Sequence, residues 1–465
     1  MRPLIRNSSI VLIWILLTLL LLAYLLQVAN LVAYGGAITA GELLAFVEAN
    51  GYEATDVWDY CMRYIWPYWL VICCVFVGVL YLAWQIFIRG TRIQRIIYSA
   101  IVTLLLVPLC FPLQHNIFRE TMCVVHEIRL IRNHRNDNRN FAYHAKRTNV
   151  PEGKEIYVLA IGESLRYKNF SLNGEYERET TPFLKQQANL VLYSDYYANA
   201  TLTQHAMPML LTPSTPETFE EHFQYKTVAA AYHEVGFKTA LVSHRAQLMN
   251  NGYHDYLAKD FDTTIFVVHD SLIAPALATL IEQNHKLFVV TNYLGNHMFY
   301  TNRTEDCVIW RPDYNVDPKS KNDSLFMNAY DNSLLYTDRI LNNEIETLTQ
   351  IDGICAWMFV SDHGEFICPH ISGHGHTYHP TKEEYHVPLM VWCSEEYADA
   401  YTDKVENMTR QKDEPICADY VFWSVLDMAG IRVEENDNEY SIFNNQLKSI
   451  DRTLLLPDGK AEMNL

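Results

Sequence analysis

The stretch EIYVLAIGES, from Glu155 to Ser164, decides the fold of this chain. Its first part is an almost unbroken apolar run, which is typical of a strand buried on both faces of a parallel sheet. Similar runs recur at Lys238–Ser243, Lys286–Thr291, Ile354–Val360 and Val387–Trp392. Helical patterns lie between them, at Val228–Val235, Ser324–Leu348 and Ala418–Ala429. This alternation predicts a doubly wound α/β domain over residues 154–465, with ligands at the carboxyl ends of its strands.

The segment before this domain has a different composition, because it carries no charged side chain from Asn7 to Ala40. Two further long apolar runs follow this one. We therefore predict a transmembrane domain over residues 1–114, with about three helices at 10–33, 64–88 and 96–113. A cleavable signal peptide is the alternative for the first run, although that run is long and no small-residue cleavage site follows promptly.

The charges beside these runs predict how the chain crosses the membrane. Arginines precede the first run and separate the second from the third, whereas the loop between the first and second is acidic. The positive-inside rule then places the N-terminus in the cytoplasm and everything after residue 114 outside. Residues 115–153 are rich in arginine, and we expect a linker there that is partly helical at the membrane surface. A plain solvated linker is an equally open interpretation.

The overall composition argues against several classes of protein. The chain has 465 residues and a formal net charge of −18, so it lacks the basic balance of a nucleic-acid binder. Its mean hydropathy of −0.07 is too low for a protein embedded wholly in the bilayer. None of the ten cysteines forms a CxxC pair, which argues against a zinc ribbon or a thioredoxin-type site. An oxidising compartment would allow disulfides, but the sequence assigns no pairs, and Cys355 is expected to be a free thiol.

Two acidic clusters follow predicted central strands. Glu163 and Ser164 come after the first strand, and the run Ser361-Asp-His-Gly-Glu365 comes after another. Glutamate, aspartate and histidine supply the oxygen and nitrogen ligands that zinc accepts. Asp362 and His363, adjacent on a tight turn, could bind one ion together with Glu163. The alternative is a helix-capping aspartate beside an incidental histidine.

Thr203 is the candidate nucleophile. It follows the strand-like stretch Leu190–Tyr197 and precedes an apolar helical turn, so its hydroxyl would stand at a helix N-terminus, where phosphate binds well. A threonine hydroxyl is a poor nucleophile unless a metal lowers its pKa. The alternative is that Thr203 only caps the helix. Ser164 is a rival nucleophile, but it lacks the second glycine of a G-x-S-x-G elbow.

Histidines gather in the same predicted region. His297 follows the strand LFVVTNY, and four more histidines crowd the segment after Glu365: His370, His374, His376 and His379. Such a group could contact phosphate or form a second metal position. Spacing alone does not decide which of them matter.

The motifs, taken in chain order, resemble those of the phosphoethanolamine transferases, membrane-anchored members of the alkaline phosphatase superfamily. The matching stretches are Ile161–Arg166, Asn169–Gly174, Thr180–Leu184, Thr203 five residues before Pro208, Gly295–His297, Tyr330–Asp338, Ser361–Glu365 and His374-Gly375. The chain departs from the family in having three predicted spans rather than five. It also has Asn199 and Met209 where cysteines often flank the nucleophile.

The resemblance implies a fold, a cofactor and a reaction. Zn²⁺ would be bound by Glu163, Thr203, Asp362 and His363, with Thr203 covalently modified during catalysis and His297 and His374 binding the substrate. The donor would be phosphatidylethanolamine, and the acceptor lipid A, a core sugar or another envelope glycan. The enzyme would be a monomer in the bacterial inner membrane, multi-pass, in contact with membrane lipids and with no nucleic-acid partner, and its alkaline-phosphatase-like catalytic domain would be periplasmic.

Two other functions stay open at this point. One is a phosphoglycerol transferase or phosphodiesterase of the same superfamily, built on the same zinc and threonine. The other is a non-catalytic membrane-anchored interaction protein. Loss of a predicted zinc ligand would favour the second, but all four ligands are present.

Overall fold

The structure, a computed structural model, describes residues 38–48, single positions between 77 and 93, 117–134, 137–244, 257–313, 323–368, 371–375, 379–433 and 438–463. The three predicted membrane spans lie outside these residues, apart from single positions in the second span. Within the described residues, no helix is both long enough and apolar enough to cross a bilayer. The chain divides into two compact units, Met1–Val124 and Val125–Leu465. Helix α2 (Ala40–Glu48) belongs to the first unit, and α6 (Ile117–His134) crosses the boundary between the two.

A seven-stranded sheet runs through the second unit, in the order β3-β11-β8-β2-β7-β5-β6. The strands from β8 to β6 in that order are mutually parallel, whereas β11 is antiparallel to both of its neighbours. The parallel part confirms the predicted α/β class, but the sequence did not indicate the direction of β11. The strand bounds are β2 Glu155–Gly162, β3 Leu190–Tyr193, β5 Lys238–Ser243, β6 Thr263–Phe266, β7 Lys286–Asn292, β8 Ile354–Ser361 and β11 Leu389–Cys393.

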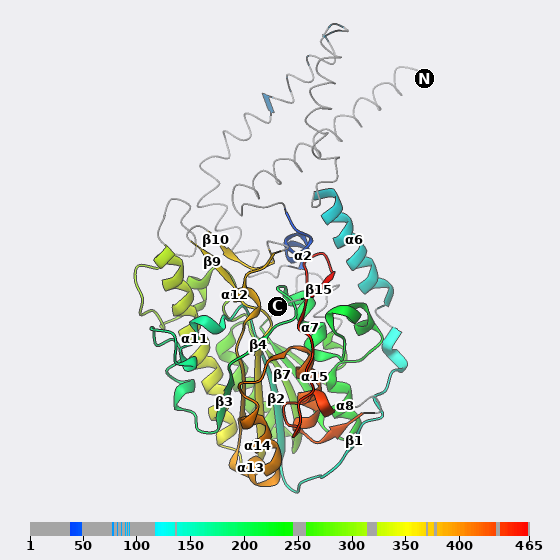
Figure 1. The fold of residues 1–465 in the computed structure, drawn as a ribbon, viewed down its shortest axis with the longest axis vertical. Coiled ribbons are helices and arrows are strands. Elements are labelled where there is room, and N and C mark those ends of the chain that lie inside the picture. Colours follow the sequence, from blue (N-terminus) through cyan, green and yellow to red (C-terminus); the bar gives the residue numbers. More distant parts are fainter. Residues whose placement is uncertain are drawn as a thin grey trace. The chain divides into compact units, whose positions relative to one another are not determined.

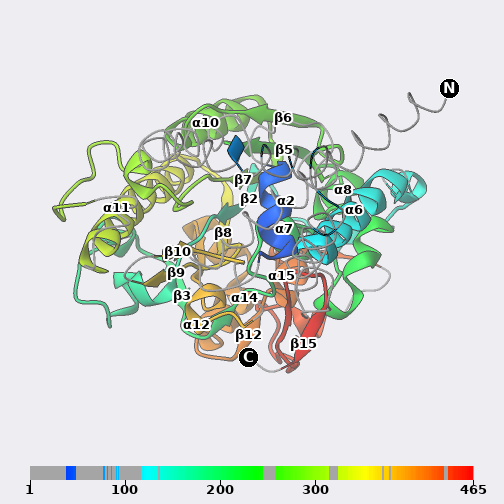
Figure 2. The ribbon, with the colours of Figure 1, turned by 90° about the horizontal axis from the view of Figure 1, so that it is seen from above.

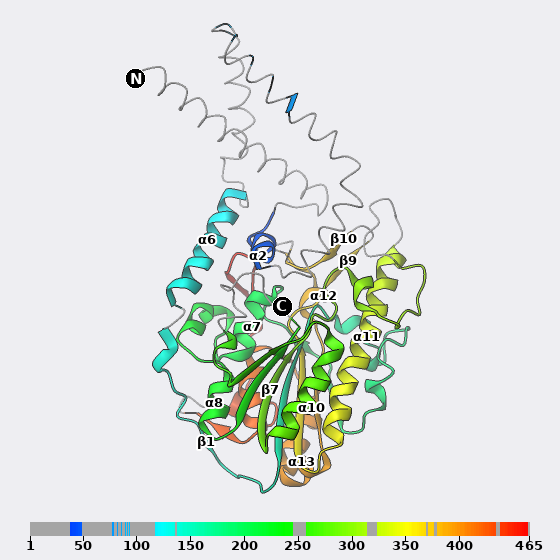
Figure 3. The same cartoon turned by 180° about the vertical axis from the view of Figure 1, so that it is seen from behind.

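Helices cover both faces of this sheet (Figures 1 and 3). Alternate side chains of β2 point to opposite faces, so Ile156 and Val158 join one core cluster while Tyr157 and Leu159 join the other. The first cluster includes residues of α10 and α11, and the second includes residues of α7, α8 and α15. The helix bounds are α7 Thr203–Leu211, α8 Val228–Glu234, α10 Ile273–Gln283, α11 Asp323–Thr349, α12 Lys382–Tyr385, α13 Glu395–Ala400, α14 Thr402–Arg410 and α15 Asp419–Met428.

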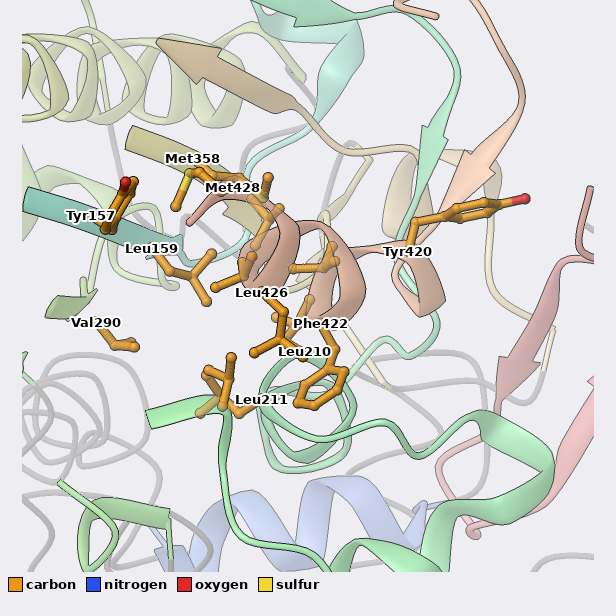
Figure 4. Packing of buried hydrophobic residues seen from close by; sticks show 14 of the residues in the cluster. Tyr157, Leu159, Leu210, Leu211, Val290, Met358, Tyr420, Phe422, Leu426 and Met428 are labelled. Atoms are coloured by element: carbon orange, nitrogen blue, oxygen red, sulfur yellow. The ribbon is translucent and has the colours of Figure 1, made fainter. Parts of the chain in front are cut away.

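Helix α7 is anchored through its apolar C-terminal half (Figure 4). Leu210 and Leu211 belong to the same buried cluster as Phe422 and Leu426 of α15 and as Leu159 of β2. Burying a leucine or phenylalanine side chain contributes about 1.5–3 kcal/mol. This packing holds the N-terminus of α7 at the carboxyl ends of the central strands, the end of the sheet that Figure 2 views from above.

The opposite end of β2 carries a buried ion cluster. The carboxylate of Glu155 accepts two hydrogen bonds from Arg147, at 2.6 and 3.0 Å, and lies 3.0 Å from the ammonium group of Lys286. Burial raises the pKa of Glu155, but the hydrogen bonds and charge of Arg147 outweigh it and lower that pKa overall. A fully buried carboxylate is therefore kept ionised at the amino end of the sheet.

Short elements complete the second unit. A hairpin of β9 and β10 follows β8 and leads to His374, and β12 pairs in parallel with β4 just before the segment that contains Thr203. The remaining strands are β1 Lys146–Arg147, β4 Tyr196–Tyr197, β9 Phe366–Cys368, β10 Ile371–Gly373, β12 Ile416–Cys417, β13 Ile431–Arg432, β14 Thr453–Leu455 and β15 Ala461–Met463. Short 3-10 helices include η6 (Pro216–Phe223), η7 (Asp270–Leu272) and η8 (Tyr300–Arg303). Cys355 is a free, buried thiol, as predicted.

Candidate active site

Two neighbouring strands bring the predicted acidic residues together. β2 and β8 pair in parallel with Gly162 opposite Ser361, so Glu163 and Asp362 follow directly at the same edge of the sheet. The backbone N–H of Asp362 donates to the carbonyl of Gly162 at 3.1 Å, and Oδ1 of Asp362 accepts from the N–H of Ser164 at 3.2 Å. Both carboxylates are buried. They lie close together because each is the first residue after the last paired residue of its strand.

Thr203 is the first residue of α7 and points at these groups. Its Oγ1 donates to Oε2 of Glu163 at 3.0 Å and lies 3.3 Å from Nε2 of His363. The N-cap residue of the helix is Leu202, so the alternative in which Thr203 merely caps α7 is wrong. The Thr203 hydroxyl instead donates to the carboxylate of Glu163. It does so at the N-terminus of α7, where the helix dipole favours a bound anion.

His363 presents one defined nitrogen to the same point. Its Nδ1 lies 2.8 Å from the carbonyl oxygen of Gly364, and only an N–H can donate to that oxygen. In the neutral ring Nε2 therefore carries a lone pair, and it lies 3.3 Å from Oε1 of Glu163 and 3.4 Å from Oδ2 of Asp362. A backbone carbonyl that fixes the ring in this way is the usual support of a metal-binding histidine.

The charges of this group favour a bound cation. Burial lowers the pKa of His363, but the carboxylates of Asp362 and Glu163 outweigh burial and raise that pKa to about 10. Ligand atoms of Glu163, Asp362 and His363 lie within 4.8 Å of one another, and Thr203 adds a hydroxyl oxygen to the set. Three oxygens and one imidazole nitrogen, buried and net negative, are a donor set that fits Zn²⁺.

His297 and His374 complete the predicted residues. Ligand atoms of Glu163, His297 and His374 also lie within 4.8 Å of one another, and the rings of His363 and His374 are 3.9 Å apart between centroids. The structure thus brings all six predicted site residues into one cluster. His370 and His376 lie outside the described residues, and His379 is exposed.

Sequence reasoning missed the support of His374. Glu365 accepts from Nδ1 of His374 at 2.9 Å through one oxygen and from the hydroxyl of Tyr300 at 2.7 Å through the other. Burial raises the pKa of Glu365 to about 7, although the Tyr300 hydrogen bond acts in the opposite direction. The position of Glu365 directly after Asp-His-Gly was a signal for its importance. Nothing in the sequence pointed to Tyr300.

The turn that carries His363 depends on a close backbone approach. Gly364 donates its N–H to the carbonyl of Glu384 at 2.7 Å, and a β-carbon on Gly364 would stand 2.0 Å from the carbonyl oxygen of Glu383. Real β-carbons do not approach an oxygen so closely, so any side chain here must push the turn away from its neighbour.

Gly364→Ala is therefore expected to weaken zinc binding by at least about tenfold and to lower the free energy of unfolding by about 1–3 kcal/mol, the usual cost of overpacking. Gly353→Ala is the matched control, because its β-carbon would stand 2.8 Å from the carbonyl oxygen of Lys154 at the other end of the sheet. That variant should lose stability and keep the zinc affinity. Thermal unfolding and calorimetric zinc titration measure both quantities. Equal zinc affinities in the two variants would contradict the importance of this turn.

Comparison with known proteins decides the family. A family model named Sulfatase matches residues 155–431. The chain belongs to the sulfatase family. Among relatives of this sulfatase-family chain, the Kdo(2)-lipid A phosphoethanolamine 7''-transferase of Salmonella typhimurium is 25% identical over 277 residues, which are 56% of this chain and 48% of that protein. Phosphoethanolamine transferase EptA of Helicobacter pylori is 26% identical over 286 residues, 58% of this chain and 52% of that protein. The chain spans about half the length of the curated relatives it matches.

Solved structures show the same fold. The integral membrane protein lipooligosaccharide phosphoethanolamine transferase A from Neisseria meningitidis aligns with a TM-score of 0.66 and 18% identity, over 92% of this chain and 86% of that chain. The C-terminal periplasmic domain of EptC from Escherichia coli, in complex with Zn, aligns with a TM-score of 0.60 and 21% identity, over 67% of this chain and 92% of that chain. The predicted resemblance to phosphoethanolamine transferases and the alkaline-phosphatase-like fold of the sulfatase-family domain are both confirmed.

Proposed function

We propose that this chain transfers phosphoethanolamine from phosphatidylethanolamine to a cell-envelope acceptor, which would be lipid A, a core sugar or another glycan. The observation that carries the proposal is the hydroxyl of Thr203, at the N-terminus of α7, within 3.0 Å of Glu163 and 3.3 Å of His363. Relatives named as phosphoethanolamine transferases support the choice of transferred group, and one of those names specifies Kdo(2)-lipid A.

Glu163, Thr203, Asp362 and His363 would hold one Zn²⁺. When bound, this ion would lower the pKa of the threonine hydroxyl and offset negative charge on the phosphoryl oxygens. The zinc complex of the related EptC domain supports this assignment, as does the donor chemistry of the four residues.

The proposed reaction consists of two successive displacements at phosphorus. Oγ1 of Thr203 attacks the phosphorus, the bond from phosphorus to the diacylglycerol oxygen breaks, and that oxygen leaves with the proton that Thr203 gives up. The phosphoethanolamine group now rests on Thr203, at the N-terminus of α7, where the helix dipole would favour its negative oxygens. An acceptor hydroxyl then attacks the same phosphorus, the bond from phosphorus to Oγ1 of Thr203 breaks, and the proton of the acceptor hydroxyl is passed on to Oγ1, which restores the threonine.

His374 is suited to take the proton of the acceptor hydroxyl. Its Nδ1–H is held by Glu365, so in the neutral ring Nε2 is the basic nitrogen. His297 lies beside it, with 5.9 Å between the ring centroids, and would contact the phosphoryl group. These two roles agree with the substrate-binding role that the family resemblance implies for both histidines.

The proposed organisation places this reaction at a membrane. Residues 1–114 would form the transmembrane domain of a bacterial inner-membrane protein, 115–153 the linker, and 154–465 the periplasmic catalytic domain of a monomer. The charge pattern of the sequence supports this orientation. The similar Neisseria protein, described as an integral membrane protein, supports the anchor.

Headgroup-labelled lipids test the proposal. Cells that carry or lack the protein are fed labelled ethanolamine or labelled glycerol, and envelope glycolipids are analysed by mass spectrometry. We expect ethanolamine label in the glycolipid fraction only when the protein is present. Glycerol label in that fraction would instead indicate a phosphoglycerol transferase. Release of water-soluble phosphoethanolamine would indicate a phosphodiesterase. No label in either form would indicate a non-catalytic protein.

A further inference from the structure

A buried carboxylate outside the predicted site holds the loop that carries His297. Asp270 begins η7, directly after the loop that follows β6. Its Oδ1 accepts from the backbone N–H of Leu294 at 3.0 Å, and its Oδ2 accepts from the N–H of Gly295 at 2.9 Å. One carboxylate thus binds two consecutive backbone donors of the loop that continues β7.

His244 supports this carboxylate from behind. It follows the last residue of β5, and its Nδ1 lies 2.9 Å from Oδ1 of Asp270. Burial raises the pKa of Asp270, but His244 and the two backbone donors lower it overall. The carboxylate is therefore ionised, and its hydrogen bonds to the loop are the stronger, charge-assisted kind.

The same loop, residues 294–297, also contacts Glu163, one of the predicted metal ligands. The N–H of Asn296 donates to the backbone carbonyl of Glu163 at 3.1 Å. The side chain of Asn296 donates to Ser333 and accepts from Thr337, both at 2.8 Å. The loop is held between Asp270 on one side and Glu163 on the other, so its position bears directly on His297, the next residue.

We propose that Asp270, supported by His244, is a positioning residue that sets residues 294–297 so that His297 faces the phosphoryl group on Thr203. The hydrogen bonds of the Asp270 carboxylate go to His244, Leu294 and Gly295, none of which is a predicted metal ligand. The inference rests on the proposed function for the role of His297. The hydrogen bonds from residues 294 and 295 to Asp270 belong to the fold itself, so their effect on the loop can be measured without any substrate.

The chain offers a matched control for this carboxylate. Asp338 is also buried and also accepts from two consecutive backbone donors, Phe183 N–H at 2.8 Å and Leu184 N–H at 3.1 Å. Those donors belong to the start of η5 (Leu184–Gln186), which contributes none of the six site residues. Asp338→Asn thus also removes a buried carboxylate that accepts from two consecutive backbone N–H groups, and neither donor belongs to the His297 loop. Because burial raises the pKa of Asp338 to about 7, the comparison is made at about pH 8.5, where both carboxylates are ionised.

The experiment compares Asp270→Asn, Asp338→Asn, His297→Ala and the double variant Asp270→Asn/His297→Ala in the full chain. In Asp270→Asn we expect amide hydrogen exchange in residues 293–297 to accelerate at least about tenfold, with zinc content unchanged. Transfer from a fluorescent phosphatidylethanolamine should fall about 30-fold in kcat/KM, as expected for a misplaced contact. In the His297→Ala background the same change should cost less than about threefold, because coupled residues are not additive.

Unchanged exchange in the loop, or an equal loss of kcat/KM in both backgrounds, would overturn the proposal. Asp338→Asn should alter exchange only around residues 183–184 and leave kcat/KM within about twofold of wild type. If Asp270→Asn does not accumulate, His244→Phe makes the same comparison with one donor removed. A wild-type chain that transfers nothing would refute the proposed function, and the exchange data would then decide on the loop alone.

Discussion

Thr203→Val is expected to lower the proposed phosphoethanolamine transfer by at least about 10³-fold, since it removes the proposed nucleophile and leaves only binding and electrostatic effects. Valine keeps the shape of the side chain, so α7 and its packing should stay in place. Wild-type protein incubated with phosphatidylethanolamine alone should gain one phosphoethanolamine group on the peptide that contains Thr203. Quenched samples analysed by mass spectrometry show both results.

Thr201→Val is the matched control for this variant. Thr201 is a buried threonine two positions earlier in the same segment, and its hydroxyl has no hydrogen-bond partner among the described residues. Its loss should leave transfer within about twofold of wild type. A modified peptide containing Ser164, whose hydroxyl donates to Glu163 at 2.8 Å, would make the rival nucleophile the correct one. So would an active Thr203→Val enzyme.

If Zn²⁺ binds as proposed, Asp362→Asn should abolish the stabilisation that the ion is expected to provide. A ligand present at 100 times its Kd stabilises the folded state by about 2.7 kcal/mol, so wild-type protein should unfold at a clearly higher temperature with zinc than without it. The variant loses one of two adjacent carboxylates, and its zinc affinity should fall by at least about 10²-fold. Transfer should fall with it, and chelation of the wild-type metal should give the same loss, reversible on adding zinc.

Asp427→Asn separates this effect from a general loss of buried charge. Asp427 is buried with ion pairs to Lys404 at 2.9 Å and to Arg432 at 2.8 Å, among none of the site residues. The Asp427 variant should unfold at a lower temperature and still show the full zinc-induced increase. A zinc-induced increase of wild-type size in Asp362→Asn would remove Asp362 from the proposed ligand set.

The strands were predictable where apolar runs are long and uninterrupted. β5 has the predicted bounds, and β7 and β8 end one residue later than predicted. β6 has only four residues, two of them threonines, and offers no such run. The direction of β11 depends on how the chain returns from β8. Among the described residues of that connection, the helix is the four-residue α12, which is too short for a crossover helix and is consistent with an antiparallel return.

The site was predictable to the extent that strand ends and motifs could locate it. Glu163 and Asp362 lie at the ends of two recognisable strands that pair in register. Thr203 was placed by its expected helix N-terminus together with the family resemblance. Glu365 contacts His374 across a hairpin, and Asp270 contacts the backbone of Gly295 from another loop. Both contacts join residues that are separated in the sequence, so no local sequence pattern predicts them.

Two buried carboxylates flank strand β2: Glu155 is its first residue, and Glu163 follows its last. The two differ in which substitutions they should tolerate. Glu155 is neutralised by its own neighbours, and a buried ionic group of this kind can often be exchanged as a set for apolar side chains of similar volume. Glu163, eight residues further on, has no apolar substitute, since its charge would serve an external ion. A screen that selects only for folding would therefore tolerate substitutions at Glu163. It would retain either the Glu155 ion cluster or an apolar replacement of that cluster. A screen for catalysis would retain Glu163 in addition, because activity requires both the folded domain and the proposed metal ligand.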